Sequence, residues 1–260
     1  MAETKTFVAN APVWVDLSST DAAKARDYYA NLFGWKVELA PEPDAGGYAL
    51  AKLHGKDVAG IGPAQTPDGP SAWMVYIGTH DADKVAKAVE AAGGKVIAPP
   101  FDVLKSGRMA VFQDPAGAFI SVWQPTEMNG AEVMGEPGSY AWAELNARGI
   151  DTAKPFYQKV FGWAGHDVGM GDDQPPYTEF HLAGERIAGG MEMNPMVPEQ
   201  VPSYWMVYFA VADVDKAFKK AIDTGGQEML APQDFPGGRF AILSDPQGAS
   251  FGLLKMKQDQ

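Results

Sequence analysis

The hydrophobic residues near the start of the chain follow two periods, one after the other. Over residues 13–18, VWVDLS, apolar side chains alternate with others at a period of two, which predicts a strand with two different faces. Ser19, Thr20 and Asp21 then offer helix caps, and apolar residues recur at helical spacing until Gly34 ends the run. We therefore expect a strand followed by a helix over residues 13–34.

The same order returns from residue 73. Residues 73–77, WMVYI, alternate again, Asp81 or Asp83 can cap a helix, and an apolar stripe runs from Val85 to the glycines at 93 and 94. Short alternating runs broken by Gly and Pro follow each helix. One break, residues 114–117, DPAG, places Asp, Pro and Gly at positions one, two and four of a type I turn. Each quarter of the chain thus predicts a βαβββ unit.

The second half of the chain repeats the first. Residues 14–35 match residues 142–163 at a constant offset, 142 − 14 = 128, and both segments end in FGW. Two further blocks, 71–84 with 203–216 and 107–118 with 238–249, follow in the same order. We predict an α+β protein of two tandem domains, 8–125 and 138–257, joined by a Gly-, Glu- and Met-rich linker at 126–137.

Composition narrows the possible partners. The net charge of −12 disfavours nucleic acid and anionic lipid surfaces. The absence of cysteine excludes disulfides, thiolate metal sites and a cysteine nucleophile. The N-terminal segment has no signal-peptide pattern, no apolar run reaches the length of a membrane span, and no strand-linked GxGxxG or P-loop occurs. We expect a cytoplasmic protein that binds a small molecule rather than a nucleotide, a nucleic acid or a membrane.

Three motifs carry a family resemblance. They are the FYxxLFGW-type helix ends at 28–35 and 156–163, the helix starts DADKV at 81–85 and DVDKA at 213–217, and the two DPxG turns. With them the chain resembles the vicinal oxygen chelate superfamily of glyoxalase I, the bleomycin resistance proteins and the extradiol dioxygenases. It most resembles a tandem-domain actinobacterial branch that includes a mycobacterial antigen. The resemblance implies four βαβββ units in two cup-shaped mixed sheets with helices outside, and a chain that imitates a family dimer, either as a monomer or within a homodimer.

The resemblance also implies metal positions, and the chain departs from them. Metal-dependent members carry His or Gln on the first strand of a unit and Glu on a last strand. Those positions here hold Trp14, Trp142, Met74, Met206, Ser121 and Gly252. Such residues do not supply the imidazole and carboxylate donors that a divalent ion requires. We therefore predict no cofactor and no metal at the family positions.

Strand alternation places a carboxylate in each cup. If residues 13, 15 and 17 pack under the helix, then Trp14, Asp16 and Ser18 point into the first cup, and Trp142, Glu144 and Asn146 point into the second. Asp16 and Glu144 are candidate catalytic groups, because a buried acid is costly unless it is paired or used. The alternative is a structural carboxylate held by backbone amides or by an arginine.

The same alternation places Met74, Tyr76, Met206 and Tyr208 beside the two tryptophans, with Ser121 on a neighbouring strand. Aromatic walls with adaptable methionines suit an apolar, aromatic ligand. The alternative is that these side chains only fill the core.

His181, Arg108 and Arg239 are the remaining candidates. His181 is the one histidine predicted on an inner strand and could act as an acid, a base or a metal ligand, whereas His54, His80 and His166 fall in turn-like contexts. A hydrogen-bonded structural histidine is the alternative. Arg108 and Arg239 could bind a ligand carboxylate or phosphate, or could pair with Asp102 and Asp234.

Three hypotheses follow for function. The first is a small-molecule-binding protein of the glyoxalase and bleomycin-resistance type, using aromatic cups without the family metal. The second is a metal-independent enzyme of the same fold, of hydroxylase-associated, isomerase or cyclase type, with a carboxylate or His181 transferring a proton. The third is a metal-dependent lyase or dioxygenase with non-family ligands drawn from His181, Glu179, Glu144 and Asp16. Whether the chain is an enzyme stays open at the level of sequence.

Overall fold

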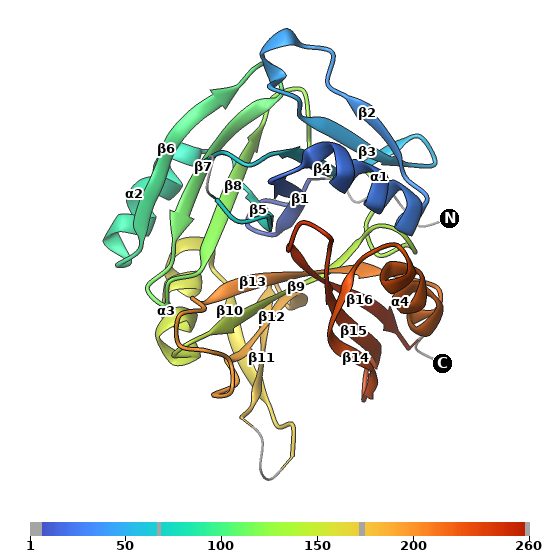
Figure 1. Ribbon diagram of the computed structural model, residues 1–260. Helices are drawn as coiled ribbons and strands as arrows, with labels where there is room; N and C mark the ends of the chain where they lie inside the picture. The colour runs from blue at the N-terminus through green and yellow to red at the C-terminus, as the bar shows by residue number, and fades with distance from the viewer. Residues whose placement is uncertain (1–6, 67–68, 172–174, 258–260) are drawn as a thin grey trace.

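Each half of the chain forms one curved eight-stranded sheet in the computed structural model, which describes residues 7–66, 69–171 and 175–257 (Figure 1). The first half contains β1 (Pro12–Ser19), α1 (Ala22–Phe33), β2 (Lys36–Leu39), β3 (Ala49–Leu53), β4 (Lys56–Pro63), β5 (Ala72–Gly78), α2 (Ala82–Ala91), β6 (Lys95–Val103), β7 (Gly107–Gln113) and β8 (Phe119–Pro125). The second half contains β9 (Tyr140–Ala147), α3 (Ile150–Phe161), β10 (Ala164–Val168), β11 (Tyr177–Leu182), β12 (Glu185–Glu192), β13 (Tyr204–Ala210), α4 (Val214–Asp223), β14 (Gln227–Phe235), β15 (Gly238–Ser244) and β16 (Ser250–Met256).

The predicted α+β class and the four βαβββ units are confirmed. The first sheet has the order β2-β3-β4-β1-β5-β8-β7-β6, and the second repeats it as β10-β11-β12-β9-β13-β16-β15-β14. In each sheet the first strands of two units pair antiparallel, β1 with β5 and β9 with β13. Each first strand also pairs in parallel with the last strand of its own unit, as β1 does with β4. The candidate residues on β1, β5 and β8 therefore lie side by side.

Local sequence sets the helix ends. The Asp21 carboxylate accepts from the Lys24 amide at 3.1 Å and caps α1, while Gly34 ends it in the left-handed conformation at φ 73°. Asp81 and Asp213 cap α2 and α4 in the same way. Helix α3 follows Gly149, which has no side chain, and the Glu192 carboxylate accepts from the first amides instead.

The main hydrophobic core runs through both halves on the helix side of the sheets. It includes Val15 and Leu17 of β1 together with Leu145 of β9. Val13 does not follow them, because the register shifts between Pro12 and Trp14, and Val13 packs in the same cluster as Trp14 on the other face. The predicted alternation is therefore correct from residue 14 onward and wrong at residue 13.

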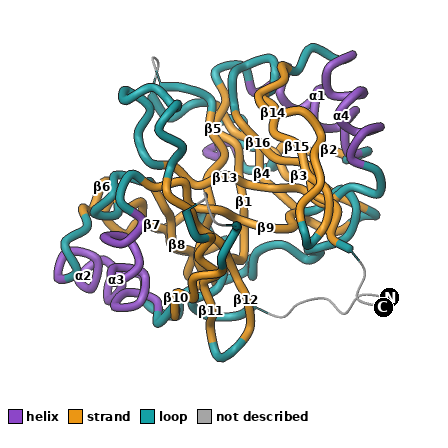
Figure 2. The backbone as a smooth tube through the Cα atoms, turned by 90° about the horizontal axis from the view of Figure 1, so that it is seen from below, coloured by secondary structure: helices purple, strands orange, loops and turns teal. Residues whose placement is uncertain are grey.

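The two halves contact each other through equivalent residues. Helix α1 lies beside α4 and α2 beside α3, so the helices form two pairs at opposite ends of the molecule (Figure 2). Tyr29 donates to the Asp245 carboxylate at 3.1 Å, and Tyr157 donates to Asp114 at 2.8 Å. The aspartate of each DPxG turn therefore accepts a hydrogen bond from a tyrosine of the opposite half. The contact between the halves is thus repeated at two equivalent places.

The segment predicted as a linker is bonded to the first half. The Ala131 amide donates to the Val13 carbonyl at 2.8 Å, and the Glu132 carboxylate accepts from the Asp57 amide at 2.7 Å. Met128 accepts from the indole of Trp123. This segment thus packs as part of the first domain's surface. Within the described part of the chain, every helix is too short or too polar to cross a membrane.

Candidate functional site

Asp16 lies at the centre of a hydrogen-bonded cluster on the inner face of the first sheet. The hydroxyls of Tyr76 and Tyr48 donate to the same carboxylate oxygen, Oδ2, at 3.0 and 3.2 Å. The Trp14 indole in turn donates to the Tyr48 hydroxyl at 3.1 Å. Strands β1 and β5 and the residue just before β3 thus together support one carboxylate.

The second sheet repeats the cluster around Glu144. Tyr208 donates to Glu144 Oε1 at 3.2 Å, and the side-chain amide of Asn146 lies 3.4 Å from the same oxygen. The Trp142 indole donates to the Tyr177 hydroxyl at 2.9 Å. A tryptophan, two tyrosines and a carboxylate therefore occur at equivalent positions in both halves.

Burial changes the acidity of these groups. It raises the pKa of Asp16 from 3.8 to about 6, and the hydrogen bonds from Tyr76 and Tyr48 offset part of the rise. Burial also raises the pKa of Glu144, against hydrogen bonds from Tyr177, Asn146 and Tyr208. The tyrosines remain neutral donors, since burial raises the pKa of the Tyr48 and Tyr76 hydroxyls well above 10.0. Asp16 can therefore exchange a proton near neutral pH.

The tyrosines reach the carboxylates because the strand between them carries glycine. A Cβ at Gly60 would lie 1.7 Å from the Tyr48 hydroxyl oxygen, and a Cβ at Gly189 would lie 1.8 Å from that of Tyr177. Gly60 pairs with Asp16 on β1, and Gly189 pairs with Glu144 on β9. Each glycine thus leaves the space in which a tyrosine crosses the sheet surface to its carboxylate.

We predict that Gly60→Ala displaces Tyr48 from Asp16. The added methyl group should destabilise the protein by about 1–3 kcal/mol through overpacking, and loss of the Tyr48 hydrogen bond should raise the pKa of Asp16 further. Denaturant unfolding and carboxyl carbon NMR measure the two effects. Gly169→Ala is the matched control, because a Cβ there meets nothing within 4 Å. An unchanged Asp16 pKa in Gly60→Ala would contradict the arrangement.

The structure brings the other predicted inner-face residues together in rows. Trp14 pairs with Tyr76, and Tyr76 pairs with Ser121, while Met74 lies opposite Asp16. The second sheet has the equivalent row of Trp142, Tyr208 and Gly252, with Met206 opposite Glu144. Trp14, Tyr76 and Met74 belong to one apolar cluster, and Met206, Tyr208 and Trp142 to another.

His181 makes its hydrogen bond outside the two carboxylate clusters. Its Nε2 lies 3.1 Å from Glu179 Oε2, and its ring packs against His166 at 4.6 Å between centroids. Arg186 donates to the other Glu179 oxygen at 3.2 Å. His181 thus bonds to Glu179 on the same strand, β11, whereas Asp16 lies in the other sheet. This agrees with a hydrogen-bonded structural histidine.

Arg108 and Arg239 are engaged by aspartates. Arg108 bonds to Asp83 at the start of α2 and to Asp102 on β6, each at 2.9 Å. Arg239 makes the equivalent contacts with Asp215 and Asp234. The pairing with Asp102 and Asp234 that the sequence offered as an alternative is present, and each guanidinium ties a helix start to an outer hairpin.

Sequence reasoning missed Tyr48 and Tyr177. The repeat contained a signal for them. The two tyrosines are separated by 177 − 48 = 129 positions, one more than the offset of 128 in the first repeated block. Tyr48 precedes β3 and Tyr177 begins β11, and neither was connected to a carboxylate because the connection crosses β4 or β12. Only the sheet order places them beside Asp16 and Glu144.

Comparison with known proteins identifies the family. The model of the Glyoxalase/Bleomycin resistance protein/Dioxygenase superfamily matches residues 11–122 and 139–253. The chain belongs to this superfamily. The match covers both sheets, and the resemblance drawn from the sequence motifs is thereby confirmed.

Relatives within the superfamily match nearly the whole chain. The anthracycline biosynthesis protein DnrV of Streptomyces peucetius is 41% identical over 97% of this chain and 95% of its own length. The putative glyoxylase CFP32 of Mycobacterium bovis is 41% identical over 96% of each chain. Among solved structures, the Mn(II)-bound glyoxalase from Novosphingobium aromaticivorans superposes with a TM-score of 0.65 at 17% identity, covering 95% of this chain and 82% of that one. The last likeness is one of fold.

The metal positions that the superfamily resemblance implies do not suit a metal here. Trp14, Met74 and Ser121 hold them in the first sheet, and the indole of Trp14 is already bonded to Tyr48. In the second sheet a Cβ at Gly252 would lie 2.0 Å from the Tyr208 ring, so that position leaves space for an aromatic ring instead of a carboxylate. No group of three or more His, Asp or Glu side chains suited to a metal ion occurs within residues 7–66, 69–171 and 175–257.

Proposed function

We propose that this superfamily member binds an aromatic, multi-ring small molecule on the inner faces of its two sheets, with Asp16 and Glu144 as polar anchors and without the family metal. The observation that carries this proposal is the duplicated cluster of tryptophan, two tyrosines and a carboxylate. The cluster lies on the inner sheet faces, among the cross-strand residues at which the family resemblance implies metal ligands.

The side chains around the carboxylates favour a flat, apolar ligand. Trp14, Tyr76 and Trp123 form the apolar cluster of the first sheet, with Met74 and Met109 packed against it. Aromatic rings stack on flat ligands, and methionine adapts to irregular ones. Two relatives, 41% and 40% identical to this chain, are named anthracycline biosynthesis proteins, which supports a polycyclic aromatic natural product as the ligand class.

Titration with an anthracycline tests the proposal. Saturable quenching of tryptophan fluorescence with a matching calorimetric isotherm is expected. Asp16→Asn and Glu144→Gln should each weaken binding by about tenfold through loss of a charge-assisted hydrogen bond. Ile222→Ala, an exposed apolar truncation on helix α4, should leave affinity unchanged. If anthracyclines and a broad set of other aromatic ligands give no saturable binding, the proposal is wrong.

A metal-independent enzyme is the second candidate, and the pKa of about 6 at Asp16 favours it. A carboxyl group with that pKa can take a proton from a ligand hydroxyl or carbon acid and return it near neutral pH. The same two variants separate the candidates. A proton-transfer role should cost about 100- to 10,000-fold in turnover of the bound compound, whereas an anchor changes affinity alone. Elemental analysis after reconstitution with divalent metals tests the absence of a metal separately.

A further inference from the structure

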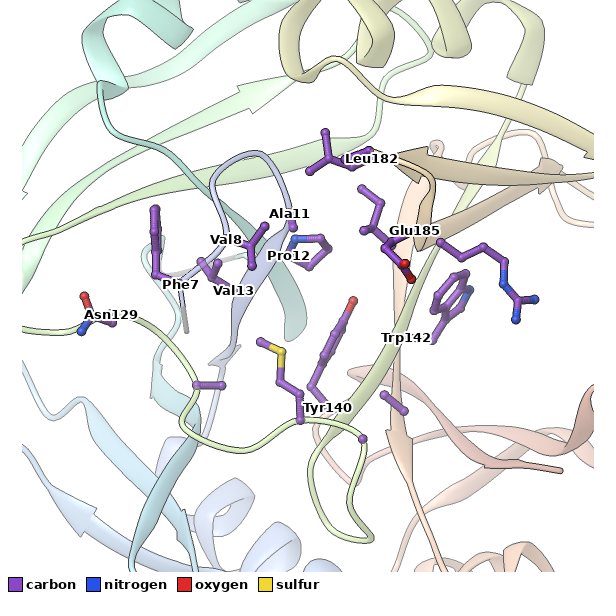
Figure 3. A pocket seen from close by; sticks show the side chains of 17 residues that line it. Phe7, Val8, Ala11, Pro12, Val13, Asn129, Tyr140, Trp142, Leu182 and Glu185 are labelled. Carbon is purple, nitrogen blue, oxygen red and sulfur yellow. The ribbon is translucent and has the colours of Figure 1, made fainter. Parts of the chain in front are cut away.

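A cavity of about 550 Å³ lies where the two halves meet, and Trp142 of the Glu144 cluster forms part of its wall (Figure 3). Four segments line it: the entry to β1 at 7–13, the connecting segment at 129–135, the start of β9 at 140–142 and the β11–β12 hairpin at 182–187. We call it the seam cavity. Its volume falls in the range of pockets that bury drug-sized ligands.

The lining is mainly apolar. Phe7, Val8, Pro12, Met134, Leu182 and Ile187 supply most of it, and the polar side chains are those of Asn129, Tyr140, Glu185 and Arg186. One of the hydrogen-bond donors of Arg186 is already used, since it donates to Glu179. Glu185 and Arg186 carry opposite charges side by side, so the lining has no net charge to select an ion.

Tyr140 is the polar side chain that indicates a ligand site. Its side chain is only 6% exposed, and its hydroxyl has no hydrogen-bond partner among the described residues. Figure 3 shows the hydroxyl directed into the cavity, between Pro12 and Glu185. A buried hydroxyl without a partner is costly and rare in folded proteins. Burial also raises the pKa of Tyr140, so the hydroxyl stays neutral and is available to donate.

Among the described residues, Tyr140 has no tyrosine counterpart in the first half, unlike the residues of the carboxylate clusters. Pro12 is the residue of the first half that is equivalent to Tyr140 in the repeat, since 140 − 128 = 12. The proline side chain has no hydrogen-bond donor. Both residues line the same cavity. One chain should therefore hold one ligand at the seam, whatever the number bound on the inner faces.

We propose that the seam cavity is a second ligand site, which takes a neutral, largely apolar molecule whose carbonyl-type oxygen accepts from Tyr140. Nothing in this proposal requires the inner faces to bind a ligand. The indole of Trp142 lines the cavity and donates to Tyr177 in the second sheet. Because the chain has seven tryptophans, the part of the fluorescence change that is lost in Trp142→Phe reports occupancy.

Benzophenone is a suitable probe, because it is a neutral aromatic ketone that crosslinks to nearby C–H bonds on irradiation. We expect saturable labelling of the intact chain at cavity residues such as Met134 or Ile187, with one molecule bound per chain at the seam. Tyr140→Phe should weaken binding about two- to tenfold, the measure of one hydrogen bond. The same variant should raise the melting temperature of the ligand-free protein by about 2–4 °C, since it removes an unpaired buried hydroxyl.

Three controls keep this site distinct from the inner faces. Tyr204→Phe removes a tyrosine hydroxyl outside the cavity and should leave labelling unchanged. Asp16→Asn and Glu144→Gln should also leave it unchanged, even if they abolish binding of anthracyclines. Labelling that falls only on residues that do not line the cavity, labelling that does not saturate, or equal affinity in Tyr140→Phe would each overturn the proposal. Ala141→Trp, which fills the cavity from its wall, should block labelling without removing the hydroxyl.

Discussion

Replacing Trp163 with alanine is expected to lower the free energy of unfolding by about 3–5 kcal/mol. Trp163 is fully buried, its ring stacks on Tyr157 with centroids 5.2 Å apart, and its indole donates to the Asn10 carbonyl of the other half at 2.6 Å. The substitution removes a large apolar surface and a hydrogen bond between the halves at once. Urea unfolding followed by circular dichroism measures the change.

Two further variants test the cause of that loss. Trp163→Phe keeps most of the buried ring and leaves the Asn10 carbonyl unpaired, so a loss of about 1–3 kcal/mol is expected. Phe101→Ala truncates an aromatic residue that is 45% exposed and should change stability by less than about 0.5 kcal/mol. A loss below about 1 kcal/mol in Trp163→Ala would show that the halves do not depend on this contact. Trp35, which donates to the Gly138 carbonyl at 2.6 Å, should behave as Trp163 does.

Asp16→Asn is expected to make the protein more stable than the wild type above pH 6. The pKa of Asp16 is about 6 in the folded protein against an ordinary 3.8, so the folded state binds more protons between these values. Stability of the wild type therefore falls as pH rises from about 4 to 6, by on the order of 3 kcal/mol. Asparagine carries no charge and still accepts from Tyr48 and Tyr76, so the variant lacks this loss.

The measurement is the difference in free energy of unfolding between variant and wild type across pH 4 to 8. Near pH 4 the two proteins should agree, and the difference should grow to its full value by pH 7. Glu144→Gln should show the same sign, because burial also raises the pKa of Glu144. Asp21→Asn gives the contrast, since hydrogen bonding to Lys24 lowers the pKa of Asp21 and its contribution is lost as pH falls. A flat difference for Asp16→Asn would mean that its carboxylate is well solvated.

The two carboxylate clusters lie on the sheet faces where the family resemblance implies metal donors. Where the resemblance implies imidazole and carboxylate donors, this chain has indole, phenol and thioether side chains that bond or pack to one another. A different carboxylate lies on the first strand of each sheet, two residues beyond the tryptophan, and is supported by neutral hydroxyls. Such an arrangement favours hydrogen bonding or proton exchange with a ligand over coordination of an ion.

Patterns along the chain were enough to predict the architecture and, from residue 14 onward, the faces of the first strand. Repeated blocks in the same order required equivalent units, and a period of two placed Trp14 and Asp16 on one face because successive strand residues point to opposite sides. The helix caps at Asp21, Asp81 and Asp213 also followed from local chemistry, since a cap bonds to amides only a few residues away.

Tertiary structure alone decided which side chains meet across distant strands and between halves. The bond from Tyr48 to Asp16 depends on the sheet order and on Gly60 lying between them. The bonds from Tyr29 to Asp245 and from Trp163 to Asn10 depend on how the halves pack. The hydroxyl of Tyr140 faces a cavity that no periodicity marks. Hydrogen bonding acts over about 3 Å in space, whereas sequence patterns report only neighbours along one element.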